Sequence, residues 1–388
     1  MESHLTIDQD SPVNQLELSM VQQANNTYVL VENDLIDSSF ACIRAVSHIH
    51  NQSIQYLYKL DDDGKYIRVY DKTLELFLKH RYALPDLADS NYECEHIKVF
   101  IKAVQNAVVP FIYDEDIPSL WRSQSNRRFP HYDEESGELK SNKTTVELKN
   151  ALTHEISKLV NTPEFKASIT ARLERTKHQY ERSSKLVQGL RDRFSKLLVL
   201  RIDLCWKAAI QDDSTFHEMK AFFSQLLKRF HHDPTLPNIV GYIWKLEFGQ
   251  KKGYHYHCMF FMDGNKFQND SHYAEVIGQH WAELTLNKGY YFNCHRDKIK
   301  YRNLAIGMAH HNDQTFYDNL DQVLVYICKQ DQFLIDKRLL NRNLRVFGTS
   351  QLPSKASPVG RPRDFKNLPK PSTSLAVLVK KKQLRSAP

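Results

Sequence analysis

The stretch most informative about the architecture is Leu197-Leu198-Val199-Leu200-Arg201-Ile202-Asp203-Leu204. A short run dominated by apolar and branched residues is typical of a strand buried inside a sheet. Two further strands are predicted at residues 238–248 and 253–262, and only the short segment from Gly249 to Gly253 connects them. Such a tight connection favours an antiparallel hairpin.

Helices and strands alternate through the rest of this half of the chain. The hairpin argues against a purely parallel sheet, so we predict an α+β domain whose central, mostly antiparallel sheet is flanked by helices. The remaining predicted elements are helices at residues 214–230, 270–286 and 312–330, and short strands near residues 290–294, 303–309 and 345–349.

The first half of the chain is predicted to be mainly helical. Apolar residues at helical spacing, beginning at Phe40 and Ile43, predict a helix within residues 38–60. A turn at Asp61–Gly64 and a short strand at residues 66–70 follow. The other expected elements are helical pieces within 72–110, broken near Pro85, a polar loop at 111–145 and a helical stretch at 146–195.

These patterns divide the chain into five segments. We predict a flexible acidic head (1–37), a mainly helical N-terminal region (38–145), a basic helical connector (146–196), the sheet domain (197–352) and a basic disordered tail (353–388).

Charge is distributed unevenly along a chain whose net charge is +7. Residues 1–43 contain seven acids and no Lys or Arg, whereas residues 355–388 contain nine bases and one acid. Ten bases and three acids also lie between Lys166 and Arg201. This distribution suggests a polyanionic partner, although charged ends that only keep the chain soluble would explain it equally well.

Composition also bears on the compartment. None of the six cysteines forms a C-x-x-C pair, and no zinc-finger spacing is present, so we expect a reducing, cytoplasmic compartment. No apolar run reaches the roughly 18 residues of a membrane span, and no secretory leader pattern is found at the start.

The segment His255-Tyr256-His257 is a candidate metal site. Side chains two apart on a strand share one face, so two imidazoles there can bind one divalent ion. Chance alone gives about one His-x-His pair among 18 histidines. His48-Ile49-His50 is such a pair, but it lies in a helical pattern, where residues two apart point to different sides.

Glu247 is the candidate third ligand. It lies on the preceding predicted strand, so in an antiparallel hairpin it can face the same side as the two histidines. Two imidazoles and one carboxylate suit Mg²⁺ or Mn²⁺ with positions left open. The alternative is an ordinary exposed acid on a strand.

Tyr326-Ile327-Cys328-Lys329 lies in the last predicted helix, where residues three apart share a face. A tyrosine hydroxyl, with a pKa near about 10, needs a polarised electrophile or a nearby positive charge to act as a nucleophile. By itself a Tyr-x-x-Lys motif is more often a surface pair. Tyr56-Leu57-Tyr58-Lys59 repeats the pattern close to the helical histidine pair.

The order of these motifs resembles the HUH endonuclease superfamily, whose members nick and rejoin DNA strands. The resemblance extends over about residues 195–352 and is greatest to the filamentous-phage (inovirus) gene II-like replication proteins, also described as the YagK/YfjJ C-terminal domain family. It is carried by residues 240–247 (VGYIWKLE), 253–257 (GYHYH), 326–329 (YICK) and 345–350 (RVFGTS).

The resemblance implies a rolling-circle replication initiator with a single catalytic tyrosine. His255 and His257 would bind Mg²⁺ or Mn²⁺, with Glu247 as a less secure third ligand. Tyr326 would form a 5′-phosphotyrosyl link, and Lys329 would position or neutralise the scissile phosphate. The implied partners are single-stranded or hairpin origin DNA, a host DNA polymerase and a host helicase, with no membrane. We predict DNA contacts from Arg201, Lys245 and Arg345, and from Asp203, which alternatively orients the site or is structural.

The tail contains Gly360-Arg361-Pro362-Arg363, which resembles an AT-hook; Arg361 and Arg363 are therefore predicted to bind DNA, either in a minor groove or through phosphates alone. Three other readings stay open. The same chemistry serves conjugative relaxases and transposases, a non-catalytic DNA-binding regulator could keep a degenerate fold of this type, and cupin-type barrels also place His-x-His on a strand. The interspersed helices argue against a barrel.

Overall fold

The computed structural model describes residues 20–22, 28–30, 34–69, 92–112, 126–133, 135–207, 213–249, 253–301, 303–329, 335–336 and 345–351. These residues form two compact units, divided between Leu173 and Glu174. Helix α8 (Pro163–Arg193) crosses the division. The predicted basic tail, with Arg361 and Arg363, lies outside the described residues.

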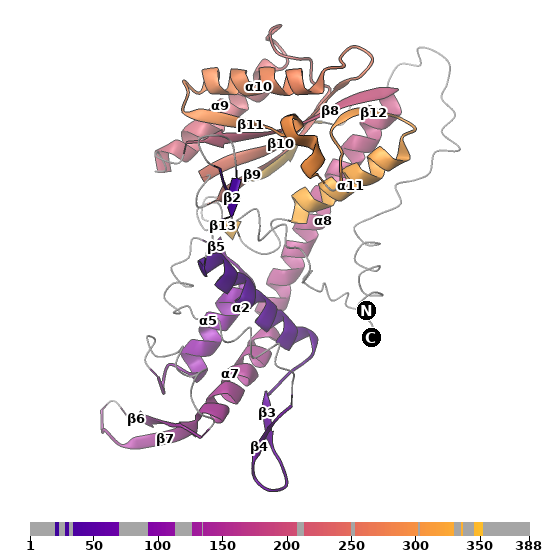
Figure 1. Cartoon of the computed structure of the whole chain (residues 1–388). Coiled ribbons are helices and arrows are strands. Elements are labelled where there is room, and N and C mark those ends of the chain that lie inside the picture. The colour runs from indigo at the N-terminus through magenta and orange to yellow at the C-terminus, as the bar shows by residue number, and fades with distance from the viewer. Residues whose placement is uncertain are drawn as a thin grey trace. The chain divides into compact units, whose positions relative to one another are not determined.

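The first unit is a small helical core with attached hairpins (Figure 1). Its buried apolar residues come mainly from α2 (Asp34–Asn51), α5 (Glu95–Ala107) and α7 (Thr145–Val160). A capping box at Thr144 and Glu147 begins α7, which explains why the helix begins there. The two-stranded sheets are β1 (Met20–Gln22) with β2 (Tyr28–Leu30), β3 (Tyr58–Leu60) with β4 (Tyr66–Arg68), β5 (Tyr92–Glu93) with β13 (Ile335–Asp336), and β6 (Arg128–Tyr132) with β7 (Leu139–Thr144).

Several elements of this unit differ from the sequence-based prediction. The helix expected within residues 38–60 ends at Asn51, and the apolar residues that continue its pattern, Ile54 and Leu57, belong to the turn and hairpin that follow. The segment 111–145, predicted as a loop, contains the hairpin of β6 and β7. Of the helical pieces expected within 72–110, α5 is present; residues 70–91, including Pro85, lie outside the described residues.

The second unit contains the predicted mostly antiparallel sheet, and every pairing within it is antiparallel. The strand order is β11-β8-β10-β9-β14, and β12 joins β8 on the same edge as β11. The expected hairpin of residues 238–262 is confirmed as β9 and β10. The strands are β8 (Lys196–Trp206), β9 (Gly241–Gly249), β10 (Gly253–Asp263), β11 (Gly289–Asn293), β12 (Gly307–His310) and β14 (Phe347–Thr349).

The two faces of the sheet differ in polarity, and β8 shows the difference most clearly. Its even-numbered side chains, from Leu198 to Trp206, are all apolar and enter one hydrophobic core. Its odd-numbered side chains face the opposite side, where only the first two, Leu197 and Val199, belong to the second core. The next odd positions are Arg201, Asp203 and Cys205. Because successive side chains alternate between faces, half of the second face is left polar.

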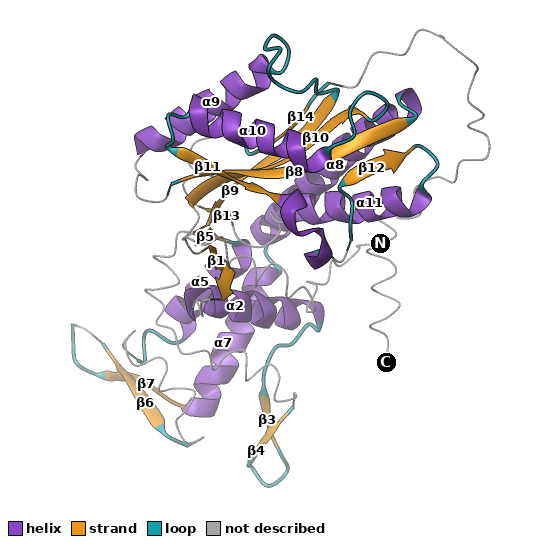
Figure 2. Ribbon diagram, turned by 45° about the horizontal axis from the view of Figure 1, so that its top comes forward, coloured by secondary structure: helices purple, strands orange, loops and turns teal. Residues whose placement is uncertain are grey.

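Helices cover the two faces differently (Figures 1 and 2). Helices α9 (Asp213–Arg229) and α10 (Asp270–Leu284) pack on the fully apolar face. Helix α11 (Gln314–Lys329) and the second half of α8 cover the apolar half of the other face. The basic connector predicted at residues 146–196 is therefore two helices, and the second half of α8 is part of the core of the sheet unit.

The described strands form an open sheet with β14 at one edge, so the cupin-type barrel is excluded for this part of the chain. All six cysteines are buried thiols. Within the described residues, none of the helices has the length and apolar character needed to cross a bilayer.

Candidate metal centre

The polar half of the second sheet face is formed by three neighbouring strands whose register is regular. His257 of β10 lies opposite Asp203 of β8 and Lys245 of β9. His255 lies opposite Glu247 in the next row. Residues directly opposite each other in an antiparallel sheet project to the same face, so these five side chains share one side of the sheet.

The predicted metal ligands lie close together. Ligand atoms of Glu247, His255 and His257 are all within 4.8 Å of one another. Glu247 Oε2 is 3.2 Å from His257 Nε2 and 3.8 Å from His255 Nε2. The two imidazole rings lie 4.8 Å apart, centroid to centroid, and are nearly perpendicular. The structure thus brings together the two histidines and the carboxylate that the sequence analysis proposed as a ligand set.

Asp203 orients one of these histidines. His257 Nδ1 lies 2.7 Å from Asp203 Oδ1, and both residues are buried. A carboxylate that accepts a hydrogen bond from one imidazole nitrogen fixes the tautomer and leaves the other nitrogen for a ligand. Of the three roles left open for Asp203, orienting the site is therefore the one that the geometry favours, and direct DNA contact is the one that its burial disfavours.

Burial and the neighbouring charges act in opposite directions on the pKa values of His257 and Glu247. Burial alone would lower the pKa of His257, but the carboxylates of Asp203 and Glu247 raise it to about 10. Burial alone would raise the pKa of Glu247, but the histidines and Lys245 hold it at about 2. The carboxylate is therefore ionised at neutral pH, as a metal ligand must be, whereas His257 is protonated and a bound cation would have to displace its Nε2 proton.

The donor set fits a divalent cation. Glu247 Oε1 is buried and has no hydrogen-bond partner among the described residues. A buried carboxylate oxygen without a donor costs free energy unless a cation or a further donor satisfies it. One carboxylate and two imidazoles are acceptable ligands for Mn²⁺ and for other divalent ions of the first transition series.

Lys245 connects the centre to helix α11. Its side chain is 1% exposed, and Nζ donates a hydrogen bond of 2.7 Å to the carbonyl oxygen of Ile327. Ile327 immediately follows Tyr326, which is half-buried and packs against the apolar core of this face. The ammonium group predicted to contact DNA is thus used inside the protein. Lys329 is the last residue of α11, but its side chain lies outside what the structure describes.

Arg201, which lies on the same face of β8 as Asp203, is at the point where the outer edge of that strand changes partner. β11 pairs with β8 from Ile202 onward, and β12 pairs with it only up to Val199. In the gap the backbone N–H of Arg201 donates to His295 Nε2 at 3.0 Å. The guanidinium lies over the ring of Tyr301, with the two centres 5.6 Å apart.

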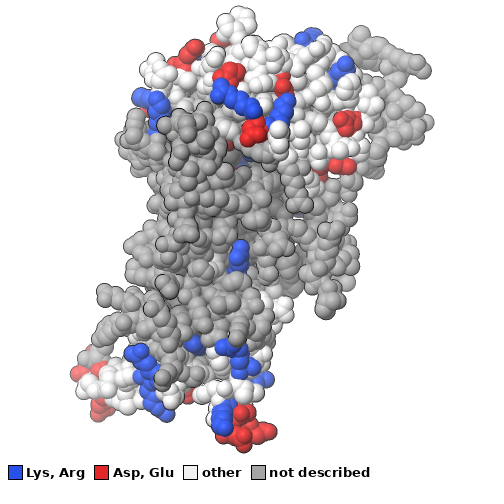
Figure 3. Space-filling view, viewed as in Figure 1, with Lys and Arg blue, Asp and Glu red and all other residues white. Residues whose placement is uncertain are grey.

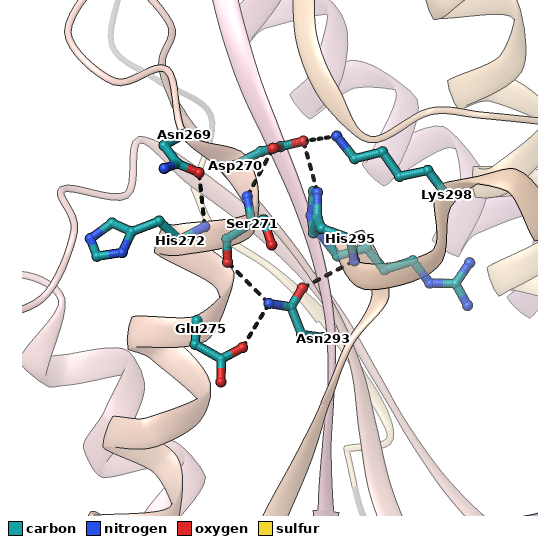
Figure 4. A network of polar contacts seen from close by, with 9 residues as sticks. Asn269, Asp270, Ser271, His272, Glu275, Asn293, His295 and Lys298 are labelled. Carbon is teal, nitrogen blue, oxygen red and sulfur yellow. Dashed lines mark hydrogen bonds and ion pairs between the residues drawn. The ribbon is translucent and has the colours of Figure 1, made fainter. Parts of the chain in front are cut away.

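A polar network holds His295 in that gap (Figure 4). His295 Nδ1 lies 2.9 Å from Asp270 Oδ2, which also binds Lys298. Burial alone would raise the pKa of Asp270, but hydrogen bonds from His295 and Lys298 hold it well below its ordinary value. The backbone N–H of His295 donates to Asn293 Oδ1. This network was not predicted from the sequence, because its members lie in two short segments, residues 269–275 and 293–298, whose pairing depends on the tertiary fold.

Among the described residues predicted to contact DNA, Arg345 is the one that lies on the surface. Arg345 is exposed just before β14, and its guanidinium lies 5.6 Å from the centre of the Trp244 ring, so it remains available as a surface contact. On the face drawn in Figure 3, acidic and basic side chains are interspersed over the described part of the sheet unit. The basic balance of the chain is therefore not visible as one uniform patch on that face.

The second His-x-His pair and the second Tyr-x-x-Lys motif both lie in the first unit. His48 and His50 lie on helix α2, as predicted. Tyr56 and Lys59 lie at the β3 hairpin instead of a helix, and the Lys59 ammonium lies 5.1 Å from the Tyr56 ring centre. Neither pattern contributes to the candidate centre.

A second group of potential ligands is found in the first unit, at the start of α5. Cys94 Sγ lies 3.6 Å from His96 Nδ1, with Glu95 between them in the chain. Arg172 binds both carboxylate oxygens of Glu95. Because a guanidinium already neutralises that carboxylate, this group is less suited to a cation than the one on the sheet.

The fold and the candidate centre together define a class: an open antiparallel sheet with a group of histidines and a carboxylate on its polar face that could hold a metal ion. The comparison with protein families is more particular. Residues 162–350 match the family model described as the YagK/YfjJ C-terminal domain. The match begins at the first turn of α8 and ends just after β14, so it starts about one long helix earlier than the resemblance seen in the motifs. No curated protein and no solved structure gives a significant match.

Proposed function

We propose that the chain is a metal-dependent DNA-nicking and strand-transfer enzyme of the HUH endonuclease superfamily, acting as a rolling-circle replication initiator. One observation carries the proposal: His255 and His257 lie on a central strand, with Glu247 opposite, and their ligand atoms are within 4.8 Å of one another. The match of the region to the YagK/YfjJ C-terminal domain supports the family on which the motif resemblance rests.

Three residues of the centre would hold a divalent cation. Glu247, His255 and His257 would be its protein ligands, and Asp203 would keep the His257 imidazole in the orientation that binding requires. A bound Mg²⁺ or Mn²⁺ would supply Lewis-acid polarisation of the scissile phosphate. Because only three protein ligands are present, positions remain for phosphate oxygens.

Tyr326 is the proposed nucleophile. Its hydroxyl oxygen attacks the scissile phosphorus, the bond from phosphorus to the 3′ oxygen breaks, and a 5′-phosphotyrosyl link forms. The phenolic proton is lost to solvent or to a nearby base, and the departing 3′ oxygen takes up a proton. Attack by a later 3′-hydroxyl reverses the step and rejoins the strand, so the bond energy is retained. Lys329 is proposed to balance charge on the phosphate.

The test uses the full-length chain, Mn²⁺ and a pool of single-stranded oligonucleotides of randomised sequence labelled at the 3′ end. A 5′-phosphotyrosyl link leaves the labelled downstream fragment attached to the protein, so label should migrate with the denatured chain. We expect this adduct with the unmodified protein and at least 10³-fold less with Tyr326→Phe. DNA binding, measured by anisotropy, should be nearly unchanged.

The matched control is Tyr317→Phe, which removes the hydroxyl of another tyrosine on α11 while keeping its ring beside Arg191. This variant should form the adduct normally. Adduct formation by Tyr326→Phe would refute the nucleophile assignment. DNA binding by the unmodified protein with no adduct under any of these conditions would favour the non-catalytic regulator.

A further inference from the structure

Lys245 is an unusual residue to find inside the sheet unit. It is 1% exposed, lies between Ile243 and Glu247 on the site face of β9, and is directly opposite His257. Burying an ammonium group is costly unless strong hydrogen bonds or opposite charges compensate for lost hydration. The sequence places a lysine at the boundary between the apolar and polar halves of this face, where an apolar residue would pack without that cost.

The contact made by its Nζ atom supplies part of the compensation. It donates to Ile327 O, one of the last four carbonyls of α11, which have no partner within a helix. The carboxyl end of a helix also carries partial negative charge, which favours a nearby cation. The last turn of α11 is therefore held to β9 by a charge-assisted bond from a buried side chain.

This bond restrains the last turn of α11, which also carries Tyr326, the neighbour of Ile327 in the helix. A shift of α11 by one residue would move each side chain by 1.5 Å along the helix axis and by about 100° around it. Either displacement would take a tyrosine hydroxyl out of reach of a phosphate held at the metal centre, since in-line attack requires reacting atoms about 3–3.5 Å apart.

The charge of Lys245 disfavours metal binding at the centre, although its hydrogen bond restrains α11. The ammonium group stabilises the ionised form of Glu247, and it repels a cation that binds to the same carboxylate. A residue present only to assist metal binding would not carry this charge here. The contact with α11 is a benefit of a different kind, because it restrains the helix that carries Tyr326.

We propose that Lys245 is a positioning residue, which holds the last turn of α11, and with it Tyr326, in register with the strand that carries Glu247. This inference rests on the proposed function, because it assigns Tyr326 a role at the metal centre. It predicts effects of opposite sign on two measurements: removing the lysine should weaken adduct formation and strengthen metal binding.

The experiment compares the full-length protein with Lys245→Met and Lys245→Gln. For Lys245→Met we expect Mn²⁺ affinity, measured by titration calorimetry, to rise about threefold or more because a repelling charge is lost. Formation of the 3′-labelled adduct should fall about 100-fold. Lys245→Gln, which keeps a donor for Ile327 O without the charge, should bind Mn²⁺ as Lys245→Met does and recover a substantial part of the adduct rate.

Lys288→Met is the matched control, because it removes a lysine that pairs with Glu218 elsewhere in the unit. It should change neither measurement by more than about twofold. Loss of Mn²⁺ affinity in Lys245→Met in parallel with loss of adduct would show a general structural role and overturn the proposal. So would an unchanged adduct rate.

A readout independent of catalysis separates this inference from the proposed function. Fe²⁺ bound at the centre, with ascorbate and peroxide, should cut the unmodified chain near residues 326–328, and the cut should weaken in Lys245→Met but not in Lys288→Met. This result without any DNA adduct would refute the nicking activity and leave the positioning role intact. Equal cutting in all variants would refute the positioning role.

Discussion

The carboxylate of Asp203 illustrates what a single residue contributes to the candidate centre. It lies 2.7 Å from the Nδ1 atom of His257, on the side of the ring away from Glu247. From the sequence alone, three roles were open for this acid in an apolar strand: contacting DNA, orienting the site, or a structural role. Its partner could not be deduced, because the register of β8 against β10 is determined by tertiary pairing between segments about 50 residues apart.

Substitution of Asp203 should therefore act through His257. We expect Asp203→Asn to weaken Mn²⁺ binding about tenfold, because the amide orients the imidazole less strongly than a carboxylate does. Titration calorimetry with the full-length chain measures this change. Asp270→Asn is the matched control, since it alters another carboxylate–histidine pair in the same unit outside the metal centre; equal losses in both variants would contradict the assigned role.

The role predicted for Lys245 from the sequence differs from the one that its position in the structure favours. A basic residue next to a metal-ligand motif in a chain of net charge +7 was reasonably predicted to contact DNA. It is instead buried against a helix terminus. Alternation did place it on the site face, but only the position of α11 reveals what its ammonium group binds.

At the scale of elements, strands were predicted better than their surroundings. The apolar strands β8, β9 and β10 have strong patterns, and each begins and ends within three residues of its predicted bounds. The hairpin of β6 and β7 was missed because its strands are short, polar and exposed, so they lack the apolar alternation on which prediction depends. The helix predicted within residues 38–60 is shorter than expected because α2 ends at Asn51, and the buried Ile54 and Leu57 that follow reach the same core from non-helical backbone.

Asp321, which lies where α8 packs on α11, lowers the stability of the fold in a pH-dependent way. Tyr180 donates to Asp321 Oδ1 at 2.5 Å, while Oδ2 is buried without a partner among the described residues. Burial raises the pKa of Asp321 to about 6 although the Tyr180 hydrogen bond opposes the rise. A raised pKa means that the folded state binds the proton more tightly than the unfolded state, so this acid destabilises the fold as pH rises through 4 to 6.

Asp321→Asn should remove this dependence. We expect the variant to be more stable than the unmodified protein by about 1–2 kcal/mol at pH 8, after solvent screening is allowed for, and to show little gain at pH 4. Chemical unfolding followed at both pH values measures the difference. An equal gain at the two values would mean that ionisation of Asp321 is not its cause.

At the scale of the whole molecule, the family match and the second compact unit both begin before residue 197, where the sheet domain was predicted to start. The match starts at residue 162, and the second unit starts within α8. A basic helix without a strongly apolar face was taken for a connector because its charge pattern is typical of a solvated helix. Its second half is a core element, which only the tertiary packing of Leu186, Val187 and Leu190 reveals.

The charge distribution yields a prediction for the complete chain. Residues 353–388 carry nine bases, so a chain ending at residue 352 should bind single-stranded DNA about tenfold or more weakly at low salt. Its affinity should also depend less steeply on salt, because fewer counterions are released. Anisotropy titrations over a range of salt concentrations measure both effects, and Mn²⁺ affinity serves as the control. An unchanged salt slope would show that the tail does not contact DNA.

The alternation of β8 has an evolutionary consequence. Even-numbered side chains of β8 enter the larger core, while the odd-numbered ones beyond Val199 lie on the face of the candidate centre, where Asp203 contacts His257, so the two sets can be substituted independently. Under the proposed function, a lineage that lost one histidine or the Tyr326 hydroxyl would forfeit nicking while the even-numbered core residues of β8 stayed unchanged. Its descendants could be retained for DNA binding alone. Enzymes and inactive paralogues of this architecture would then share the same core pattern and differ only at a few positions on one side of the sheet.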